Sequence, residues 1–249
     1  QKTLIAAVKK NSNTMQTAIS HDVFCGGQTW TTRPMVMGSS VIAIKYADGV
    51  MMMADTLGSY GALSRYIDIT RFAEANAYTL IGGGGEISDF QHIVKVLQEK
   101  AVEDFCIDDD EVMDPSEMFH YVSRMMYNRR NKMDPLYNQF LVGGFRDGKS
   151  FLGYTDLYGT AFEENIVCTG FGNYLSTPLL RKAWRPDLTH AEAKELLEQC
   201  LRVLFYRDSV TINRYRAATV TKEGVKISEP FSLVGKWDYK MFRAHLKEV

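Results

Sequence analysis

Hydrophobic side chains in residues 39–56 are concentrated in two short runs that are typical of β-strands. Residues 39–46 and 49–56 are rich in valine, isoleucine and methionine, and Asp48 followed by Gly49 supplies turn residues between them. The second run is apolar on both faces from residue 50 to residue 54. A strand of this kind is expected between two layers. We therefore predict a hairpin in a sheet that is covered on both sides.

Apolar residues spaced three and four positions apart predict helices in four places along the chain. These helices are expected to begin near Glu86, at Asp114, after Gly172 and at Thr189. Asp114 and Thr189 are each followed three residues later by glutamate, which is the pattern of a capping box. The glycine run at residues 82–85 is interpreted as a turn between a strand at residues 77–81 and the first helix.

Further β-type runs follow the second helix and the fourth helix. They cover residues 137–145, 150–156, 160–163, 215–221 and 225–228. The order along the chain is thus a hairpin, two helices, a strand meander, two helices and a hairpin. Helices grouped in pairs between antiparallel strands predict an α+β protein with two packed sheets and helices on both outer faces.

Charge and length exclude several classes of partner. The 249 residues include 29 basic and 30 acidic side chains, which gives a net charge of −1. A chain this close to neutral carries no broad basic field, so we expect no nucleic-acid partner. Its apolar runs are strand-sized, whereas a membrane helix needs roughly 20 residues, so no membrane partner is expected. One domain of this length can bury roughly 70–75% of its unfolded surface without a structural metal.

The sequence offers no pattern for a metal or cofactor. Its four cysteines, Cys25, Cys106, Cys168 and Cys200, lie far apart and form no metal-ligand spacing with the scattered histidines. They are interpreted as buried or free thiols in a reducing compartment. The glycine run is followed by Glu86, where a phosphate-binding loop requires lysine and a hydroxyl residue. We expect no cofactor and no metal.

Several motifs resemble those of a known family. Residues 39–46, followed by Gly49-Val50 and Met53-Ala54-Asp55, resemble the opening of proteasome β subunits. Residues 31–36, 57–61, 127–133 and 151–154 resemble one subgroup, the non-catalytic β subunits at the seventh ring position. The resemblance implies an N-terminal-nucleophile hydrolase fold, a four-layer αββα sandwich of two antiparallel sheets. This expectation agrees with the order of elements read from the chain.

The resemblance also implies the positions of a catalytic site. In active members, autolysis after a glycine frees an N-terminal threonine, whose hydroxyl attacks the peptide carbonyl with its own amine or a water as base. On this sequence the nucleophile falls on Ser39, the carboxylate on Asp55, the cation on Arg71, the oxyanion glycine on Gly85 and the second carboxylate on Asp208. Two supporting serines of the family fall on Phe171 and Thr211.

Two of these residues argue against catalysis. Arg71 stands where active members have lysine, and a guanidinium stays charged and cannot exchange a proton near neutral pH. Phe171 removes a hydroxyl and is expected to bring bulk to the site. In the resembling subgroup, processing stops at a position matching Thr31, so residues 31–38 would cover a vestigial site. Asp55, Arg71 and Asp208 are then expected to be a buried ion-pair group that stabilises the fold.

The resemblance therefore implies a structural, non-catalytic β subunit of the proteasome core particle, needed for ring assembly in ATP- and ubiquitin-dependent protein degradation. Its expected partners are other α and β subunits in a stacked-ring hetero-oligomer, located in cytoplasm and nucleus. We predict an N-terminal extension or propeptide at residues 1–30, the β-type domain at residues 31–236 and a C-terminal arm at residues 237–249.

Two alternatives stay open. One is an active serine N-terminal-nucleophile peptidase, generated by cleavage between Gly38 and Ser39. It requires a free amine on Ser39 and predicts that an electrophilic inhibitor labels this residue. The other is a self-standing binding domain outside any ring, which predicts a stable monomer.

Overall fold

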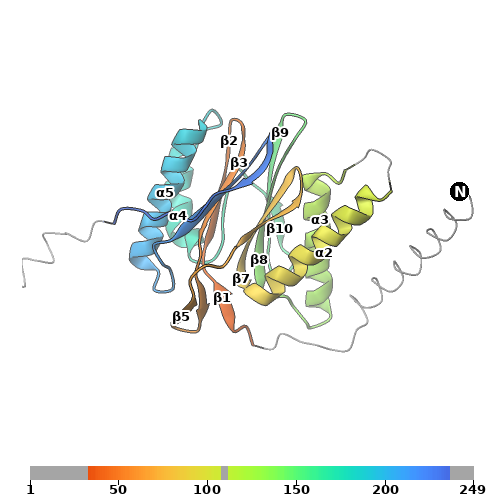
Figure 1. Ribbon diagram of the computed structural model, residues 1–249, viewed down its shortest axis with the longest axis horizontal. Helices are drawn as coiled ribbons and strands as arrows, with labels where there is room; N and C mark the ends of the chain where they lie inside the picture. Colours follow the sequence, from red (N-terminus) through yellow and green to blue (C-terminus); the bar gives the residue numbers. More distant parts are fainter. Residues whose placement is uncertain (1–32, 108–111, 236–249) are drawn as a thin grey trace, which may run out of the picture. The chain divides into compact units, whose positions relative to one another are not determined.

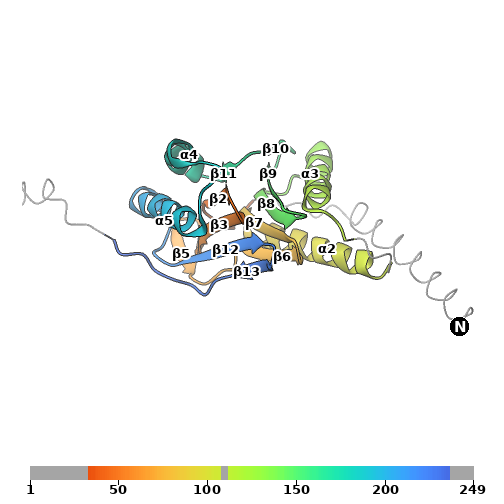
Figure 2. The ribbon, with the colours of Figure 1, turned by 90° about the horizontal axis from the view of Figure 1, so that it is seen from above.

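Two antiparallel sheets lie face to face between two pairs of helices in the computed structural model of this chain (Figure 1). The structure describes residues 33–107 and 112–235. The helices are α2 (Ile87–Phe105), α3 (Pro115–Asn131), α4 (Gly172–Ala183) and α5 (His190–Arg207). Helices α4 and α5 cover one sheet and helices α2 and α3 cover the other, as the view from above also shows (Figure 2). The predicted four-layer α+β sandwich is confirmed.

The smaller sheet contains the predicted hairpin. Its order is β11 (Ile166–Cys168), β2 (Val41–Tyr46), β3 (Gly49–Asp55), β12 (Tyr215–Thr221) and β13 (Gly224–Ile227). Strand β3 is buried along its whole length. Met51 and Met53 pack in the cluster with α4 and α5, whereas Val50 and Met52 pack in the cluster between the two sheets. The alternation of a strand places successive side chains on opposite faces, so this strand is covered on both sides, as predicted.

The larger sheet has eight strands. Its order is β10 (Ala161–Glu163), β9 (Lys149–Thr155), β8 (Asn138–Arg146), β7 (Thr79–Glu86), β1 (Val36–Gly38), β4 (Gly58–Tyr60) and β5 (Leu63–Tyr66), with β6 (Phe72–Asn76) also paired to β7. Strands β1, β4, β5, β6 and β11 were not predicted. Each is only three to five residues long, and so short a run shows no periodicity of its own.

The prediction that residues 82–85 form a turn is wrong. Strand β7 runs through the whole glycine run, and α2 follows it directly, so the predicted helix start near Glu86 is confirmed. A Cβ on Gly83 would lie 2.2 Å from the ring of Phe90. Gly85 has φ +98°, and a Cβ there would lie 2.1 Å from the carbonyl oxygen of Tyr137. These glycines therefore let helix and strand approach the β7 backbone closely.

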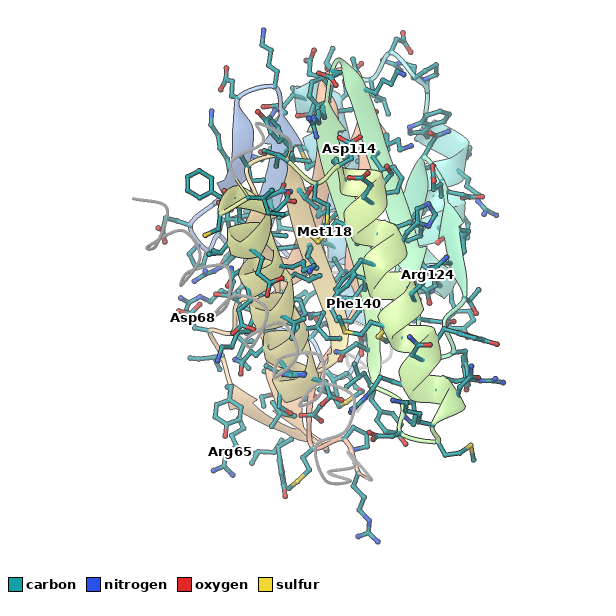
Figure 3. The ribbon with its side chains drawn as sticks, turned by 90° about the vertical axis from the view of Figure 1, so that its right-hand side faces the viewer. Arg65, Asp68, Asp114, Met118, Arg124 and Phe140 are labelled. Carbon is teal, nitrogen blue, oxygen red and sulfur yellow. The ribbon has the colours of Figure 1, made fainter. Side chains whose placement is uncertain are left out.

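The predicted helix starts agree with the structure. Both capping boxes form: Glu117 accepts from the Asp114 amide at 2.8 Å, and Glu192 accepts from the Thr189 amide at 3.0 Å. Figure 3 shows α2 and α3 lying over the larger sheet, with Met118 of α3 close to Phe140 of β8. Each fully buried side chain of this size contributes roughly 1.5–3 kcal/mol through removal from water. The helices are thus held by their apolar faces.

Some predictions fall on residues that the structure does not describe. The predicted extension at residues 1–30, the processing position Thr31 and the arm at residues 237–249 lie outside the described residues. The compact unit begins at Arg33. In the part of the chain that is described, no helix is both long enough and apolar enough to span a bilayer.

Candidate functional site

Three of the predicted site residues meet at one end of the sandwich. Ser39 links β1 to β2, Asp55 ends β3, and Arg71 directly precedes β6. The Ser39 hydroxyl donates to Asp55 Oδ1 at 3.0 Å, and Arg71 Nη1 donates to the same oxygen at 2.5 Å. Two sheets that pack face to face therefore bring together residues from three separate parts of the chain.

The Arg71 guanidinium is buried and fully engaged. Its side chain is 0% exposed and that of Asp55 is 2% exposed. Besides Asp55, Arg71 donates from Nη2 to the Ser39 carbonyl oxygen and from Nε to the Gly83 carbonyl oxygen at 3.3 Å. Glycine makes the space for this group, because a Cβ on Gly38 would lie 2.9 Å from Arg71 Nε. The cation is thus tied to backbone carbonyls as well as to a carboxylate.

Burial dominates the electrostatics of this pair. Removal from water raises the pKa of the Asp55 carboxyl, while the Arg71 charge and hydrogen bonds from Ser39 and Thr211 oppose that rise. Burial likewise lowers the pKa of Arg71, and Asp55 opposes that change. Each ion is therefore compensated chiefly by the other, and removing one partner would leave an unpaired buried charge.

Thr211 and Asp208 lie beside the pair. A small cavity there is lined by Ser39, Asp55, Asp208 and Thr211, with leucines of α5 closing it. Thr211 Oγ1 donates to Asp55 Oδ2 at 3.2 Å. Asp208 is partly exposed, and its Oδ1 accepts from the Val210 amide at 3.0 Å. The expectation that Asp208 belongs to the buried ion-pair group therefore needs correction: it lines the cavity, but the buried ion pair is Asp55 with Arg71.

Phe171 does not enter the cavity. Its side chain is 45% exposed, and its ring lies 6.1 Å from that of Tyr174, in an edge-on contact. The neighbouring glycine amide of Gly172 donates to the Ser40 hydroxyl at 2.9 Å, so the backbone here reaches the site although the phenyl ring does not. The expected bulk at the site is wrong, because the ring is absent from the cavity lining.

A strand that the sequence did not predict occupies the space next to Ser39. Strand β1 lies between β7 and β4, with Met37 opposite both Glu86 and Ser59, and with Gly38 opposite Gly85. The predicted oxyanion glycine therefore faces the chain's own backbone. The Ser59 hydroxyl also donates to the Met37 carbonyl oxygen at 3.1 Å. We call the space between β7 and β4, filled by β1, the groove.

Glu86 makes buried contacts next to the site that sequence reasoning did not predict. It is 4% exposed, and its Oε2 accepts from the amide of Met35 at 2.5 Å and from that of Val36 at 3.2 Å. Ser88 Oγ donates to Oε1 at 3.0 Å. The only sequence signal was a carboxylate directly after the glycine run. Its partners lie about fifty residues earlier, so no local pattern could identify them.

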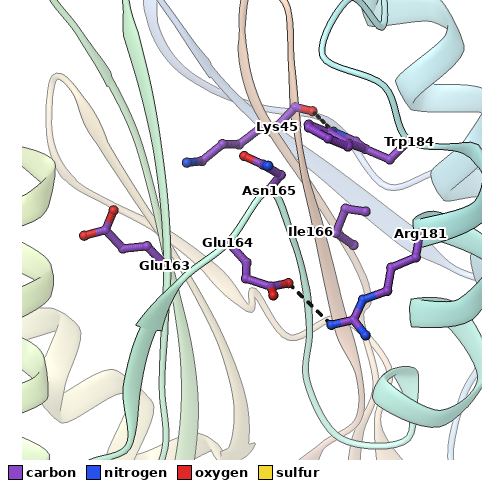
Figure 4. A pocket seen from close by; sticks show the side chains of 7 residues that line it. All are labelled: Lys45, Glu163, Glu164, Asn165, Ile166, Arg181 and Trp184. Carbon is purple, nitrogen blue, oxygen red and sulfur yellow. Dashed lines mark hydrogen bonds and ion pairs between the residues drawn. The ribbon is translucent and has the colours of Figure 1, made fainter.

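A second, wider cavity lies away from Ser39 (Figure 4). It has a volume of about 460 Å³ and is lined by Lys45, Glu163, Glu164, Asn165, Ile166, Arg181 and Trp184. Its side chains partly satisfy one another: Arg181 lies 3.6 Å from Glu164, and the Trp184 indole donates to the Lys45 carbonyl oxygen at 2.9 Å. Burial lowers the pKa of Lys45, against the charge of Glu163. None of the seven lining residues carries a hydroxyl or thiol, so this cavity offers no nucleophile of those types.

Metal ligands do not gather in the described residues either. Across residues 33–107 and 112–235, no group of three or more histidine, cysteine, aspartate or glutamate side chains could hold a metal ion. The chemistry that the Ser39 arrangement could support is acyl transfer, with a hydroxyl beside a carboxylate and a cation. In the structure this hydroxyl belongs to Ser39, which lies in the short link between strands β1 and β2.

Comparison with known proteins gives consistent results. Residues 35–220 match the family described as "Proteasome subunit". The chain is 46% identical over 212 residues to "Proteasome subunit beta type-4" of Arabidopsis thaliana, covering 85% of this chain and 86% of that protein. It is 43% identical over 210 residues to the beta type-4 subunit of Dictyostelium discoideum, covering 84% and 81%. It is 37% identical over 221 residues to "Proteasome subunit beta type-7" of Saccharomyces cerevisiae, covering 84% and 83%.

Proposed function

This chain belongs to the proteasome subunit family, and from that premise we propose that it is a structural β subunit of the core particle whose own Ser39 site does not hydrolyse peptides. The fold agrees with the N-terminal-nucleophile hydrolase architecture of that family. The observation that carries the proposal is strand β1, which continues into Ser39 and is paired on both sides. The proposed role of this subunit is therefore in assembly of the core particle and not in peptide hydrolysis.

The state of Ser39 supports the absence of catalysis. A nucleophile of this type needs a free amine as its base, which Ser39 would gain only by cleavage of its bond to Gly38, and Gly38 is held in strand β1 between β7 and β4. Arg71 supports the same conclusion, because its guanidinium cannot exchange a proton near neutral pH and donates to two carbonyl oxygens as well as to Asp55. Asp55 and Arg71 then serve stability.

Occupation of the groove is a second support. An extended substrate binds to a sheet by pairing its backbone with a strand edge. Here β1 already pairs with both β7 and β4, and Gly38 stands opposite Gly85. A peptide could enter only after β1 had left. The active serine peptidase remains the alternative, favoured by the contact between Ser39 Oγ and Asp55 at 3.0 Å.

Membership of the family places this chain with other α and β subunits of the core particle. We propose a role in joining half-particles for residues 237–249, which lie outside the described residues. This segment contains Trp237, Tyr239 and Phe242, the kind of aromatic anchor found at interfaces. Its deletion is expected to lower the yield of full particles, and normal yield without it would refute this role. Residence in cytoplasm and nucleus stays a prediction.

Native mass spectrometry tests the proposal directly. The core particle is purified from its source, this subunit is ejected, and its intact mass identifies its first residue. A chain that begins at Thr31 or earlier supports the structural role, because Ser39 then has no free amine. A chain that begins at Ser39, together with labelling of Ser39 by a boronate or epoxyketone, would establish the peptidase instead.

A further inference from the structure

We propose that Glu86 anchors residues 35–38 as a built-in occupant of the groove and so protects the Gly38–Ser39 bond from cleavage by other active sites. The inference rests on the proposed function, since it explains how the segment before Ser39 stays in place. It gives Glu86 a positioning role, because the residue acts by holding the chain upstream of Ser39 and not by contacting a substrate.

The Glu86 carboxylate accepts hydrogen bonds from the backbone just before β1. It receives two consecutive backbone amides, Met35 at 2.5 Å and Val36 at 3.2 Å. Pro34 has no N–H, so Met35 carries the first amide after the proline that can donate. Hydrogen bonds to an ionised carboxylate are stronger than those between neutral groups. Glu86 therefore holds the chain where it enters the groove.

Glu86 is itself held rigidly. Its amide donates to the Tyr137 carbonyl oxygen at 2.9 Å, and its carbonyl oxygen accepts from Asn138 Nδ2 at 2.8 Å. Ser88 Oγ fixes the carboxylate through Oε1. Glu86 is also the N-cap residue of α2, where the helix dipole favours a negative charge. The position of Glu86 is thus supported by contacts that do not involve Met35 or Val36.

The anchor restricts the access of another active site to residues 36–38. A peptidase must take several residues of its substrate in extended form into its own site. Residues 36–38 are already paired with β4, and residues 37 and 38 are also paired with β7. As long as Glu86 holds the entry to β1, these residues cannot be transferred to another active site. The bond before Ser39 is therefore expected to resist cleavage by other active sites in the assembled particle.

The test compares Glu86→Gln with a matched control. Glu117→Gln alters another glutamate that accepts a backbone amide at a helix start, Asp114 N at 2.8 Å, but it lies in α3, away from the groove. Core particles are purified from cells in which the variant is the sole form of the subunit. Hydrogen exchange of the amides of Met35 and Val36 is followed by mass spectrometry after rapid digestion.

We expect exchange at these two amides to be at least about 10-fold faster in the Glu86→Gln particle, and unchanged in the Glu117→Gln particle. Limited proteolysis of the Glu86→Gln particle is expected to produce new N-termini between residues 35 and 39. Glu86→Ala, which removes both acceptors, should show a larger effect than Glu86→Gln.

Equal protection and equal N-termini in wild-type, Glu86→Gln and Glu86→Ala particles would overturn the inference. If the variants do not assemble, the wild-type particle decides: amides of Met35 and Val36 that exchange as fast as in an unstructured peptide refute the anchor, and protected ones support it. A wild-type subunit that begins at Ser39 refutes the proposed function. One that begins upstream but is indifferent to Glu86 refutes only the anchor.

Discussion

The β2–β3 hairpin and the groove strands β7, β1 and β4 differ in how buried side chains fill the space around them. In the hairpin, residues such as Ile44, Val50 and Met52 are 0% exposed and apolar. The groove strands include glycines at positions 38, 58 and 82–85, and the long charged side chains of Arg71 and Glu86 are buried against these strands. One region is packed by hydrocarbon and the other by ions held against backbone groups.

The difference determines what each region tolerates. An apolar core accepts substitutions that conserve side-chain volume, because dispersion forces and the hydrophobic effect do not depend on the orientation of the groups. A buried ion needs its partner and its hydrogen bonds, since leaving either unpaired has a large desolvation cost. We therefore expect the groove to be intolerant of substitutions that the hairpin accepts.

Arg71→Met should have the largest effect. It leaves Asp55 buried without its cation, which is expected to cost about 3–5 kcal/mol of stability. The double variant Asp55→Leu/Arg71→Met removes both charges and should recover much of that loss. The measurement is the yield of core particles that contain the variant and their melting temperature. Normal yield and an unchanged melting temperature for Arg71→Met would show that the ion pair does not stabilise the fold.

Met52→Ala tests the hairpin in the same assay. Truncating this fully buried side chain between the sheets is expected to cost about 2–5 kcal/mol. Met52→Leu keeps the volume and should cost less than about 1.5 kcal/mol. If Met52→Leu lowers the melting temperature as much as Met52→Ala, the hairpin core depends on the exact shape of its side chains. The hairpin would then be no more tolerant of substitution than the groove.

Gly85→Ala should be clearly worse than Gly61→Ala. Both glycines have positive φ, +98° and +59°, but a Cβ on Gly61 meets nothing within 4 Å, whereas one on Gly85 would lie 2.1 Å from a carbonyl oxygen. Gly61→Ala is expected to cost about 1–2 kcal/mol for the backbone conformation alone. Gly85→Ala adds displacement of backbone, for a total above about 2 kcal/mol. Equal melting temperatures would mean that β7 can shift at little cost.

The buried thiols Cys168 of β11 and Cys200 of α5 should show the weakest effect on stability but a clear pH dependence. Burial raises the pKa of Cys168 from 9.0 to about 11 and that of Cys200 to about 12. Because the folded pKa lies above the unfolded one, stability from keeping Cys168 neutral is complete below pH 9 and is lost as pH rises through about 11. The melting temperature should therefore fall less between pH 9 and 11 in Cys168→Ala particles than in wild type.

Alkylation gives an independent check. At pH 8 the raised pKa leaves Cys168 with about 100-fold less thiolate than an ordinary cysteine. Iodoacetamide should label Cys168 and Cys200 only after denaturation. Rapid labelling of either thiol in the intact particle would show that the layer under α4 and α5 opens readily.

Much of the fold could be predicted because its signals are local. The apolar run of β3, the stripe of α2 and the capping boxes at Asp114 and Thr189 each lie within a few turns of chain. The glycine run was misread, because glycine favours turns in general but here relieves contacts with Phe90 and Tyr137, which no local pattern shows.

The site was predicted in part. Motif resemblance placed Ser39, Asp55, Arg71 and Thr211, which the structure brings into mutual contact. It also suggested bulk from Phe171, whose ring instead lies outside the cavity. Side-chain direction depends on the backbone that follows Gly170, so residue identity alone could not settle it.

The amino-acid pattern was enough to predict the strands and helices whose hydrophobic period spans several residues, the order of the layers and the identity of the charged groups. The folded arrangement was needed to show that residues 36–38 form a strand between β7 and β4 and that Glu86 accepts hydrogen bonds from the two amides at the start of this strand. The physical reason is that strand pairing and buried hydrogen bonds join residues between about 20 and 50 positions apart, and neither leaves a periodic pattern in the segments that it joins.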